Sequence, residues 1–333
     1  MLGSASFLSC LVFVFLTFTA IGQAQTSIDD VHVTPREKSL ALKADLAASL
    51  PSGAGLIRTR TDLVLVPVSI TDNYNRPVIG LEQDNFQLFE NKAPQSIKHF
   101  SAEDTPVSVG IILDVSGSMS YKLEQARDAV AQFFDAANPQ DEFFLITFSE
   151  TPRLDTDFTT DTTKLENNLV TVRSKGRTSL LDAIYMGVRR MRDARYPRRA
   201  LLILSDGGDN HSRYTERDVK NAIRESDVLV YAVGTYDRYF DSEEERLGPE
   251  LLHSITDMTG GQTFVLSSEN EMPRVTRMIG TQLRHQYVLA YEPQVKHRDE
   301  KWHKISVKLL LPRKLHNYFL HVGARQGYYA GGE

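Results

Sequence analysis

The chain has 333 residues, of which 41% are hydrophobic and 24% are charged, and its formal net charge is −5. This length is enough for about two globular domains with cores of their own. The acidic balance, without a long basic run, argues against nucleic acid as a partner, because phosphate binding needs clustered Lys and Arg.

The first part of the chain has the pattern of a secretory signal peptide. Residues 7–21 are nearly all apolar, and the small residues of Gly22-Gln23-Ala24 follow where cleavage would occur. We therefore expect residues 1–24 to direct export to the periplasm, the cell surface or the medium. A retained membrane anchor is the alternative, but a run of about 15 residues is short of the roughly 20 that span a bilayer.

The mature chain is expected to lack both cysteine chemistry and a membrane span. Cys10 is the only cysteine and lies inside the signal segment, so neither disulfides nor thiolates are expected after cleavage. No later segment is long and apolar enough to be transmembrane. Residues 25–60 are read as a lead segment and linker, because an Ala/Leu-rich stretch is broken by Pro51-Ser52-Gly53-Ala54-Gly55.

Residues 61–104 alternate between apolar and polar positions, which is the pattern of β-strands. Strands are expected at 63–70, 86–90 and 95–100. After residue 286 the period of two returns, with strands expected at 287–291, 302–311 and 315–323. Each β region alone has few strands for a stable sandwich, so we predict that 61–104 and 286–333 pair as one sandwich-like domain.

Residues 105–285 alternate between strands and helices. The expected strands cover 107–113, 143–148, 200–204, 228–233 and 262–266, and the expected helices cover 121–134, 162–172, 179–195, 215–226, 250–259 and 271–283. Continuous apolar strands between helices predict a parallel sheet that is covered on both faces. The predicted fold class is therefore α/β, a doubly wound, mostly parallel, Rossmann-like sheet that is inserted in or flanked by a smaller all-β, sandwich-like domain.

Polar residues follow two of the predicted strands and precede one helix. Asp114, Ser116 and Ser118 come directly after the first strand, Asp206 follows the third, and Thr178 precedes a helix. Ligands of open parallel sheets bind beyond the carboxyl ends of the strands. Carboxylate and hydroxyl oxygens suit Mg²⁺ or Mn²⁺, and Ca²⁺ uses the same donors. Two carboxylates only neutralise a dication, so the metal could accept one more carboxylate from a partner.

These residues have simpler interpretations as well. Ser and Asp favour helix caps, so the first loop could merely cap the following helix. We expect Asp209 and Asn210 to form a solvated turn rather than to support the site. Arg189-Arg190 and Arg198-Arg199 are expected on solvated faces. Scattered histidines without metal-ligand spacing are expected in surface or structural roles, and Trp302 and the Tyr-rich tail are expected to pack within the β region.

The order Asp114-x-Ser116-x-Ser118, then Thr178, then Asp206 resembles the metal-ion-dependent adhesion site of von Willebrand factor A domains. The resemblance implies that the three hydroxyl residues coordinate directly or by switching, and that the two Asp residues coordinate directly or through water. Integrin β-type domains of this family place acidic residues just after the motif, whereas this chain has Ser120 to Lys122 there. One metal ion is therefore expected, with Mg²⁺ preferred.

The resemblance covers about residues 107–284 and implies one short antiparallel edge strand, for which 152–157 is the natural candidate. The flanks, including Gly80-Leu81 and the terminal Gly327-Tyr328-Tyr329-Ala330, resemble those of the exported bacterial proteins related to von Willebrand factor A.

The leading functional hypothesis is a non-catalytic adhesion module that captures an Asp or Glu of a partner protein. A metal-dependent hydrolase is the second, and it would need a general base, for which no candidate stands at motif spacing. An assembly cofactor of an ATPase machine is the third. The signal peptide counts against it, because such machines are cytosolic.

Overall fold

The computed structural model of the chain describes residues 63–206, 208–235, 243–293, 301–311 and 319–330. The predicted signal peptide, the lead segment with its linker, and Cys10 lie outside these residues. Within the described part of the chain, no helix combines the length and the apolar character needed to cross a bilayer.

A six-stranded sheet forms the centre of the α/β region, with strand order β10-β9-β8-β5-β6-β7. Its strands are β5 (Ser108–Asp114), β6 (Glu142–Phe148), β7 (Pro152–Thr159), β8 (Arg199–Leu204), β9 (Val228–Thr235) and β10 (Thr263–Leu266). All neighbours pair in parallel except β6 and β7, which are antiparallel. The predicted mostly parallel sheet and its antiparallel edge strand are thus confirmed. Every residue of β5 and β6 is buried, as their continuous apolar runs indicate.

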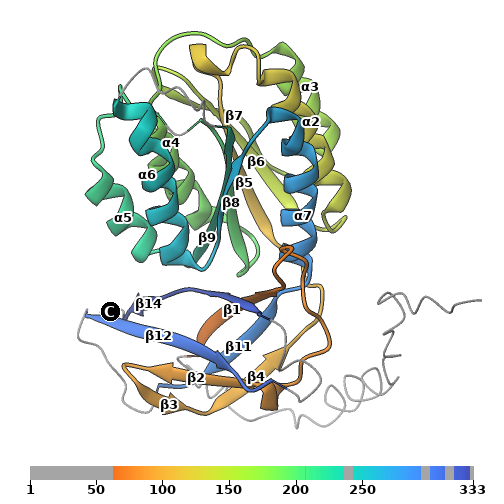
Figure 1. Cartoon of the computed structure of the whole chain (residues 1–333), viewed down its shortest axis with the longest axis vertical. Coiled ribbons are helices and arrows are strands. Elements are labelled where there is room, and N and C mark those ends of the chain that lie inside the picture. The colour runs from red at the N-terminus through yellow and green to blue at the C-terminus, as the bar shows by residue number, and fades with distance from the viewer. Residues whose placement is uncertain (1–62, 207, 236–242, 294–300, 312–318, 331–333) are drawn as a thin grey trace, which may run out of the picture. The chain divides into compact units, whose positions relative to one another are not determined.

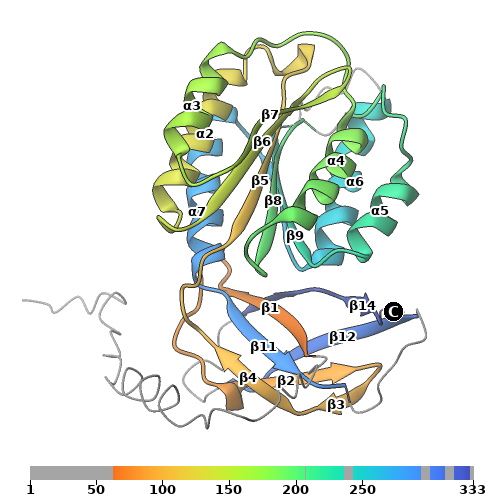
Figure 2. The ribbon, with the colours of Figure 1, turned by 180° about the vertical axis from the view of Figure 1, so that it is seen from behind.

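Helices cover both faces of this sheet (Figures 1 and 2). One face is covered by α2 (Leu123–Ala136), α3 (Thr162–Thr171) and α7 (Met272–Arg284), and the other by α4 (Leu180–Arg190), α5 (Glu216–Arg224) and α6 (Glu243–Thr259). Alternate residues of β5 enter the two cores, since Ile111 packs with the first set and Ile112 with the second.

The helix ends follow mostly local signals. Thr215 caps α5 in a reciprocal capping box with Asp218, as expected for a Thr before a helix. The helix predicted for 179–195 ends at Arg190 and continues as a 3₁₀ turn over Met191–Asp193. The helix predicted from residue 250 begins at Glu243, with Pro249 inside it. Proline is unfavourable inside a helix, so the sequence pattern placed this start too late.

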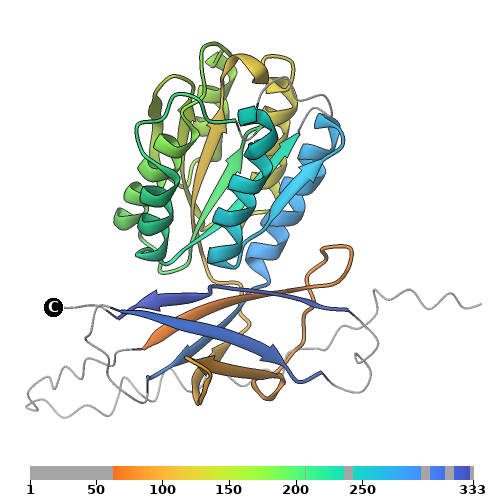
Figure 3. The same cartoon turned by 60° about the vertical axis from the view of Figure 1, so that its left-hand side comes forward.

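Two four-stranded sheets form the β region, with orders β13-β1-β11-β4 and β14-β12-β2-β3 (Figure 3). Their strands are β1 (Val64–Thr71), β2 (Phe86–Glu90), β3 (Ala93–Gln95), β4 (Ile97–Ser101), β11 (Tyr287–Tyr291), β12 (Trp302–Leu309), β13 (His321–Ala324) and β14 (Gly327–Tyr329). Part of the strand predicted for 315–323 lies outside the described residues.

Strands that precede the α/β region in the sequence pair directly with strands that follow it. β1 pairs with β11, and β2 pairs with β12, both antiparallel. Val66, Leu88, Tyr287 and Ile305, drawn from both sheets, share one buried core. A single β domain formed from both segments requires this pairing. The limits 61–104 and 286–333 stay a prediction. Trp302 packs edge-on against Tyr329 with ring centroids 5.3 Å apart, as a packing role predicts.

The prediction that Arg198 lies on a solvated face is wrong, because this residue is only 5% exposed. Its guanidinium donates hydrogen bonds to the carbonyl oxygens of Thr105 and Leu283 and to Oε1 of Gln286. Burial lowers the pKa of Arg198, and these acceptors offset the cost of removing the charge from water.

Candidate functional site

The sheet topology brings the two Asp-containing loops to one edge. β5 and β8 are parallel neighbours, so the loops that follow them leave the sheet side by side. β5 connects through α2 to β6 on one side, whereas β8 lies on its other side. The strand order therefore reverses between β5 and β8, where open α/β sheets place their ligands. Asp114 ends β5, and Asp206 is the second residue after β8.

The loop after β5 holds its polar side chains in a tight turn. The Asp114 carboxylate is fully buried and accepts hydrogen bonds from the Ser116 backbone N–H at 2.8 Å and from the Ser205 hydroxyl at 2.7 Å. A 3₁₀ turn over Gly117–Met119 then brings the hydroxyl oxygens of Ser116 and Ser118 to 3.1 Å from each other. Ser116 is buried and Ser118 is exposed, so this pair of hydroxyls reaches from the interior to the surface.

The two carboxylates of the site lie close enough to repel each other. Burial and, after it, the charge of Asp206 raise the pKa of Asp114 to about 7, against the opposing hydrogen bonds from Ser116 and Ser205. The Lys122 ammonium lies 3.3 Å from Oδ2 of Asp206 and supplies a positive charge at this place. The site therefore combines two carboxylates that repel each other with one ammonium that offsets part of their charge.

Thr178 is held against the loop after β8 by its backbone. Its N–H donates to Oδ1 of Asn210 at 3.1 Å, and its carbonyl oxygen accepts from the backbone N–H groups of Asn210 and His211. The backbone N–H of Gly117 donates to the carbonyl oxygen of Gly176 at 3.0 Å, which ties the loop after β5 to the same segment. Gly176 has a φ of +83°, a conformation that favours glycine.

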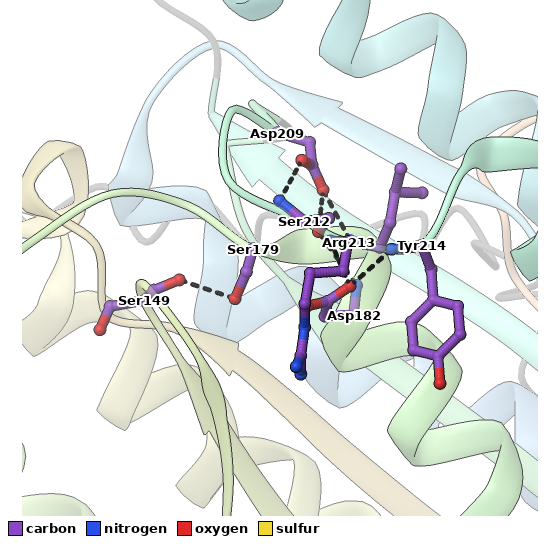
Figure 4. A network of polar contacts seen from close by, with 8 residues as sticks. Ser149, Ser179, Asp182, Asp209, Ser212, Arg213 and Tyr214 are labelled. Carbon is purple, nitrogen blue, oxygen red and sulfur yellow. Dashed lines mark hydrogen bonds and ion pairs between the residues drawn. The ribbon is translucent and has the colours of Figure 1, made fainter.

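A polar network fixes the loop after β8 to the start of α4 (Figure 4). Asp209 accepts hydrogen bonds from the Leu181 backbone N–H at 2.7 Å and from the Ser212 hydroxyl at 2.6 Å. Asp182 accepts from the backbone N–H groups of Arg213 at 2.8 Å and Tyr214 at 2.9 Å. Both carboxylates lie near the beginning of α4, where the helix dipole favours negative charge.

The prediction of a solvated turn is therefore wrong for Asp209, which is half-buried and accepts hydrogen bonds through its side chain, whereas Asn210 is exposed as predicted. Both side chains bind backbone N–H groups at the start of α4 and so position Thr178 relative to the loop that carries Asp206. Asp and Asn side chains readily accept hydrogen bonds from backbone N–H groups, but the sequence does not indicate which N–H group is the donor. Asn210 and Thr178 are 32 positions apart in sequence, so no local pattern indicates this contact.

The five predicted residues are thus connected in different ways. Ser116 and Ser118 touch, and Asp114 and Asp206 interact through their charges. Thr178 bonds to the loop after β8, and its neighbour Gly176 bonds to the loop after β5. Within the described residues, no three His, Cys, Asp or Glu side chains form a metal-binding group. A cation here would depend on hydroxyls besides two carboxylates. This all-oxygen set fits a hard dication such as Mg²⁺ and offers no soft ligand for a thiophilic metal.

Residues 109–208 match the family model of the von Willebrand factor type A domain. The chain is 28% identical over 134 residues to the human inter-alpha-trypsin inhibitor heavy chain H4, a match that covers 36% of this chain and 14% of that protein. The bovine protein of the same name is 27% identical over 168 residues, which covers 45% of this chain and 18% of that protein. The matches thus span less than a fifth of the curated relatives' length.

Solved structures with similar folds include a von Willebrand factor type A protein from Catenulispora acidiphila, with a TM-score of 0.48 and 12% identity. That match covers 81% of this chain and 75% of the other. The conserved hypothetical protein BatB from Bacteroides thetaiotaomicron has a TM-score of 0.43 and 20% identity, over 53% of this chain and 98% of the other. The sequence match thus identifies a von Willebrand factor type A domain over residues 109–208, within the α/β region.

Proposed function

We propose that the chain is an exported, non-catalytic binding module that captures an Asp or Glu side chain of a partner protein through one divalent cation. Asp114, Ser116, Ser118, Thr178 and Asp206 would hold the cation, with Mg²⁺ as the preferred ion and Mn²⁺ or Ca²⁺ as substitutes. When bound, the cation supplies an electrophilic centre for the partner's carboxylate. Export follows from the signal-like segment 1–24.

The observation that carries this proposal is the fully buried carboxylate of Asp114 beside the charge of Asp206. Placing two carboxylates together out of water costs free energy unless a cation compensates them. Two carboxylates and three neutral hydroxyls bring the total charge of a bound dication and its ligands to zero. The cation would therefore still attract one further carboxylate, as a binding site requires and a saturated structural site does not.

The exposed side of the loop offers the approach for a partner. Ser118 is exposed at the outer end of the hydroxyl pair, and Tyr121, three residues after Ser118, is 58% exposed. A partner residue that reached the cation beside Ser118 would meet the Tyr121 ring as well. Aromatic residues are enriched at protein interfaces, where they supply contact area at low entropic cost.

The arrangement supports binding rather than hydrolysis. A metal hydrolase needs a base positioned beside the metal-bound water. Asp114 and Asp206 would both be occupied with the cation. The nearby carboxylates of Asp182 and Asp209 already accept hydrogen bonds from backbone N–H groups. Their role in holding the loops leaves neither of them directed at the site as a proton acceptor.

Capture from the envelope fraction of the exporting cell tests the proposal. The mature chain on a solid support is incubated with this fraction in Mg²⁺ or in chelator, beside the variants Asp114→Ala and Asp157→Ala. Asp157 is a matched control, because its carboxylate is exposed and pairs with Arg190. We expect that the wild type and Asp157→Ala retain a partner protein in Mg²⁺ but not in chelator. Asp114→Ala should not retain this protein in either condition. Retention that is the same in chelator, or in a folded Asp114→Ala variant, would contradict the proposal.

A further inference from the structure

We propose that Lys122 is a resident cation of this site, which competes with the divalent ion for Asp206 and thereby sets how tightly the metal binds. The inference rests on the proposed metal site and adds a residue that tunes it. If Lys122 weakens metal binding in this way, the metal is not permanently bound. Partner capture would then depend on the concentration of the divalent ion around the exported protein.

The position of Lys122 is built into the fold. Its Nζ lies 3.3 Å from Oδ2 of Asp206, and the two side chains are only 6% and 12% exposed. The Lys122 backbone is fixed in the turn before α2, where its N–H donates to the carbonyl oxygen of Met119 and its own carbonyl oxygen accepts from Ala126. Lysine is almost never this buried unless it is paired, which sets Lys122 apart from an ordinary surface lysine.

A second contact holds the ammonium in this place. Nζ lies 5.1 Å from the centroid of the Tyr121 ring, within the range of a cation–π interaction. Tyr121 and Asp206 belong to different loops, which follow β5 and β8 respectively. The ammonium thus links the two loops that would carry most of the metal ligands, and its charge faces the carboxylate that the metal would use.

The Lys122 charge should stabilise the site when no divalent ion is bound and destabilise it when one is bound. The ammonium offsets part of the negative charge of Asp114 and Asp206, which stabilises the domain when it is the cation present. A dication on the same carboxylates would lie within a few ångströms of the ammonium and be repelled by it. Even at the dielectric constant of water, this repulsion corresponds to about a tenfold loss of affinity, and burial strengthens it.

Substitution of Lys122 by Met tests this directly, because Met keeps the unbranched apolar stem and removes the charge. The chelator-treated wild type, Lys122→Met and Lys220→Met are titrated with Mg²⁺ by calorimetry. Lys220 is a matched control, since it pairs with Glu216 within α5. We expect Lys122→Met to bind Mg²⁺ about tenfold more tightly than the wild type, and Lys220→Met to bind within about twofold of it.

Thermal unfolding separates this role from a merely structural one. Lys122→Met should melt at a lower temperature than the wild type in chelator, and should gain more than the wild type when Mg²⁺ is added. Equal losses in chelator and in Mg²⁺, or an unchanged or weaker Mg²⁺ affinity, would overturn the proposal. Lys122→Gln provides the same comparison if the Met variant does not fold.

The titration also distinguishes this inference from the proposed function. Mg²⁺ binding by the wild type without a gain in Lys122→Met would overturn the role of Lys122 and leave the metal site standing. Absence of Mg²⁺, Mn²⁺ and Ca²⁺ binding in the wild type and in both Lys122 variants would overturn the two together.

Discussion

Removal of the Asp182 carboxylate should destabilise the domain by detaching the loop after β8 from α4. This side chain is 3% exposed, and one of its oxygens, Oδ1, accepts the backbone N–H groups of Arg213 and Tyr214 at 2.8 and 2.9 Å. Hydrogen bonds to a charged acceptor contribute about 1.5–3 kcal/mol each. Arg213 and Tyr214 are exposed, so water can partly replace the acceptor. We therefore expect Asp182→Ala to lower the free energy of unfolding by about 2–3 kcal/mol.

The other contact of this carboxylate should matter little. Arg213 Nε lies 3.4 Å from Oδ2 of Asp182, but the arginine side chain is 82% exposed, and ion pairs in water contribute about 0–1 kcal/mol. Asp182→Asn keeps an oxygen acceptor without the charge, so its loss should be about half that of the alanine variant.

Urea denaturation in the presence of chelator measures these differences without a contribution from bound metal. Asp157→Ala serves as the control and should stay within about 0.5 kcal/mol of the wild type, because Asp157 pairs with Arg190 at an exposed position. A free energy of unfolding for Asp182→Ala within about 0.5 kcal/mol of the wild type would mean that Asp182 does not anchor the loop after β8.

Three further variants test other contacts. Asn210→Ala removes the side-chain acceptor of the Thr178 N–H. Because one hydrogen bond is lost, Mg²⁺ should bind about threefold to tenfold more weakly in calorimetry. An unchanged Mg²⁺ affinity would argue against a positioning role of Asn210. Gly110→Ala places a methyl group against the Phe144 ring and should cost about 1–3 kcal/mol in urea denaturation. Arg198→Met leaves buried acceptors unpaired, so its melting temperature should fall, and an unchanged melting temperature would contradict the importance of these bonds.

The architecture could be predicted from local patterns in the sequence. β5 and β6 are buried along their whole length, and such strands appear as continuous apolar runs. Thr215 stands before a helix as a cap, and its neighbours complete the capping box. Asp114 and Asp206 could be placed at one edge of the sheet because each stands at the carboxyl end of an apolar strand, and parallel strands end at the same edge.

The supporting contacts could not be predicted, because their partners are distant in sequence. Asp182 contacts backbone groups 31 and 32 positions away, and Arg198 reaches carbonyl oxygens 93 and 85 positions away. A charged side chain in a polar stretch looks the same whether it faces water or a backbone group of another loop. Lys122 illustrates the same limit, since 84 positions separate it from Asp206.

Calorimetric titration of Mg²⁺ into the chelator-treated mature chain shows whether Asp114 helps to hold a divalent cation. We expect saturable binding with one ion per chain, and no such binding to Asp114→Ala or to the milder Asp114→Asn, provided that circular dichroism shows both variants folded. Absence of binding to the folded wild type, with Mn²⁺ and Ca²⁺ as well as Mg²⁺, would contradict the proposed metal site. Undiminished binding to both Asp114 variants would contradict it equally, because the buried carboxylate would then have no part in holding the ion.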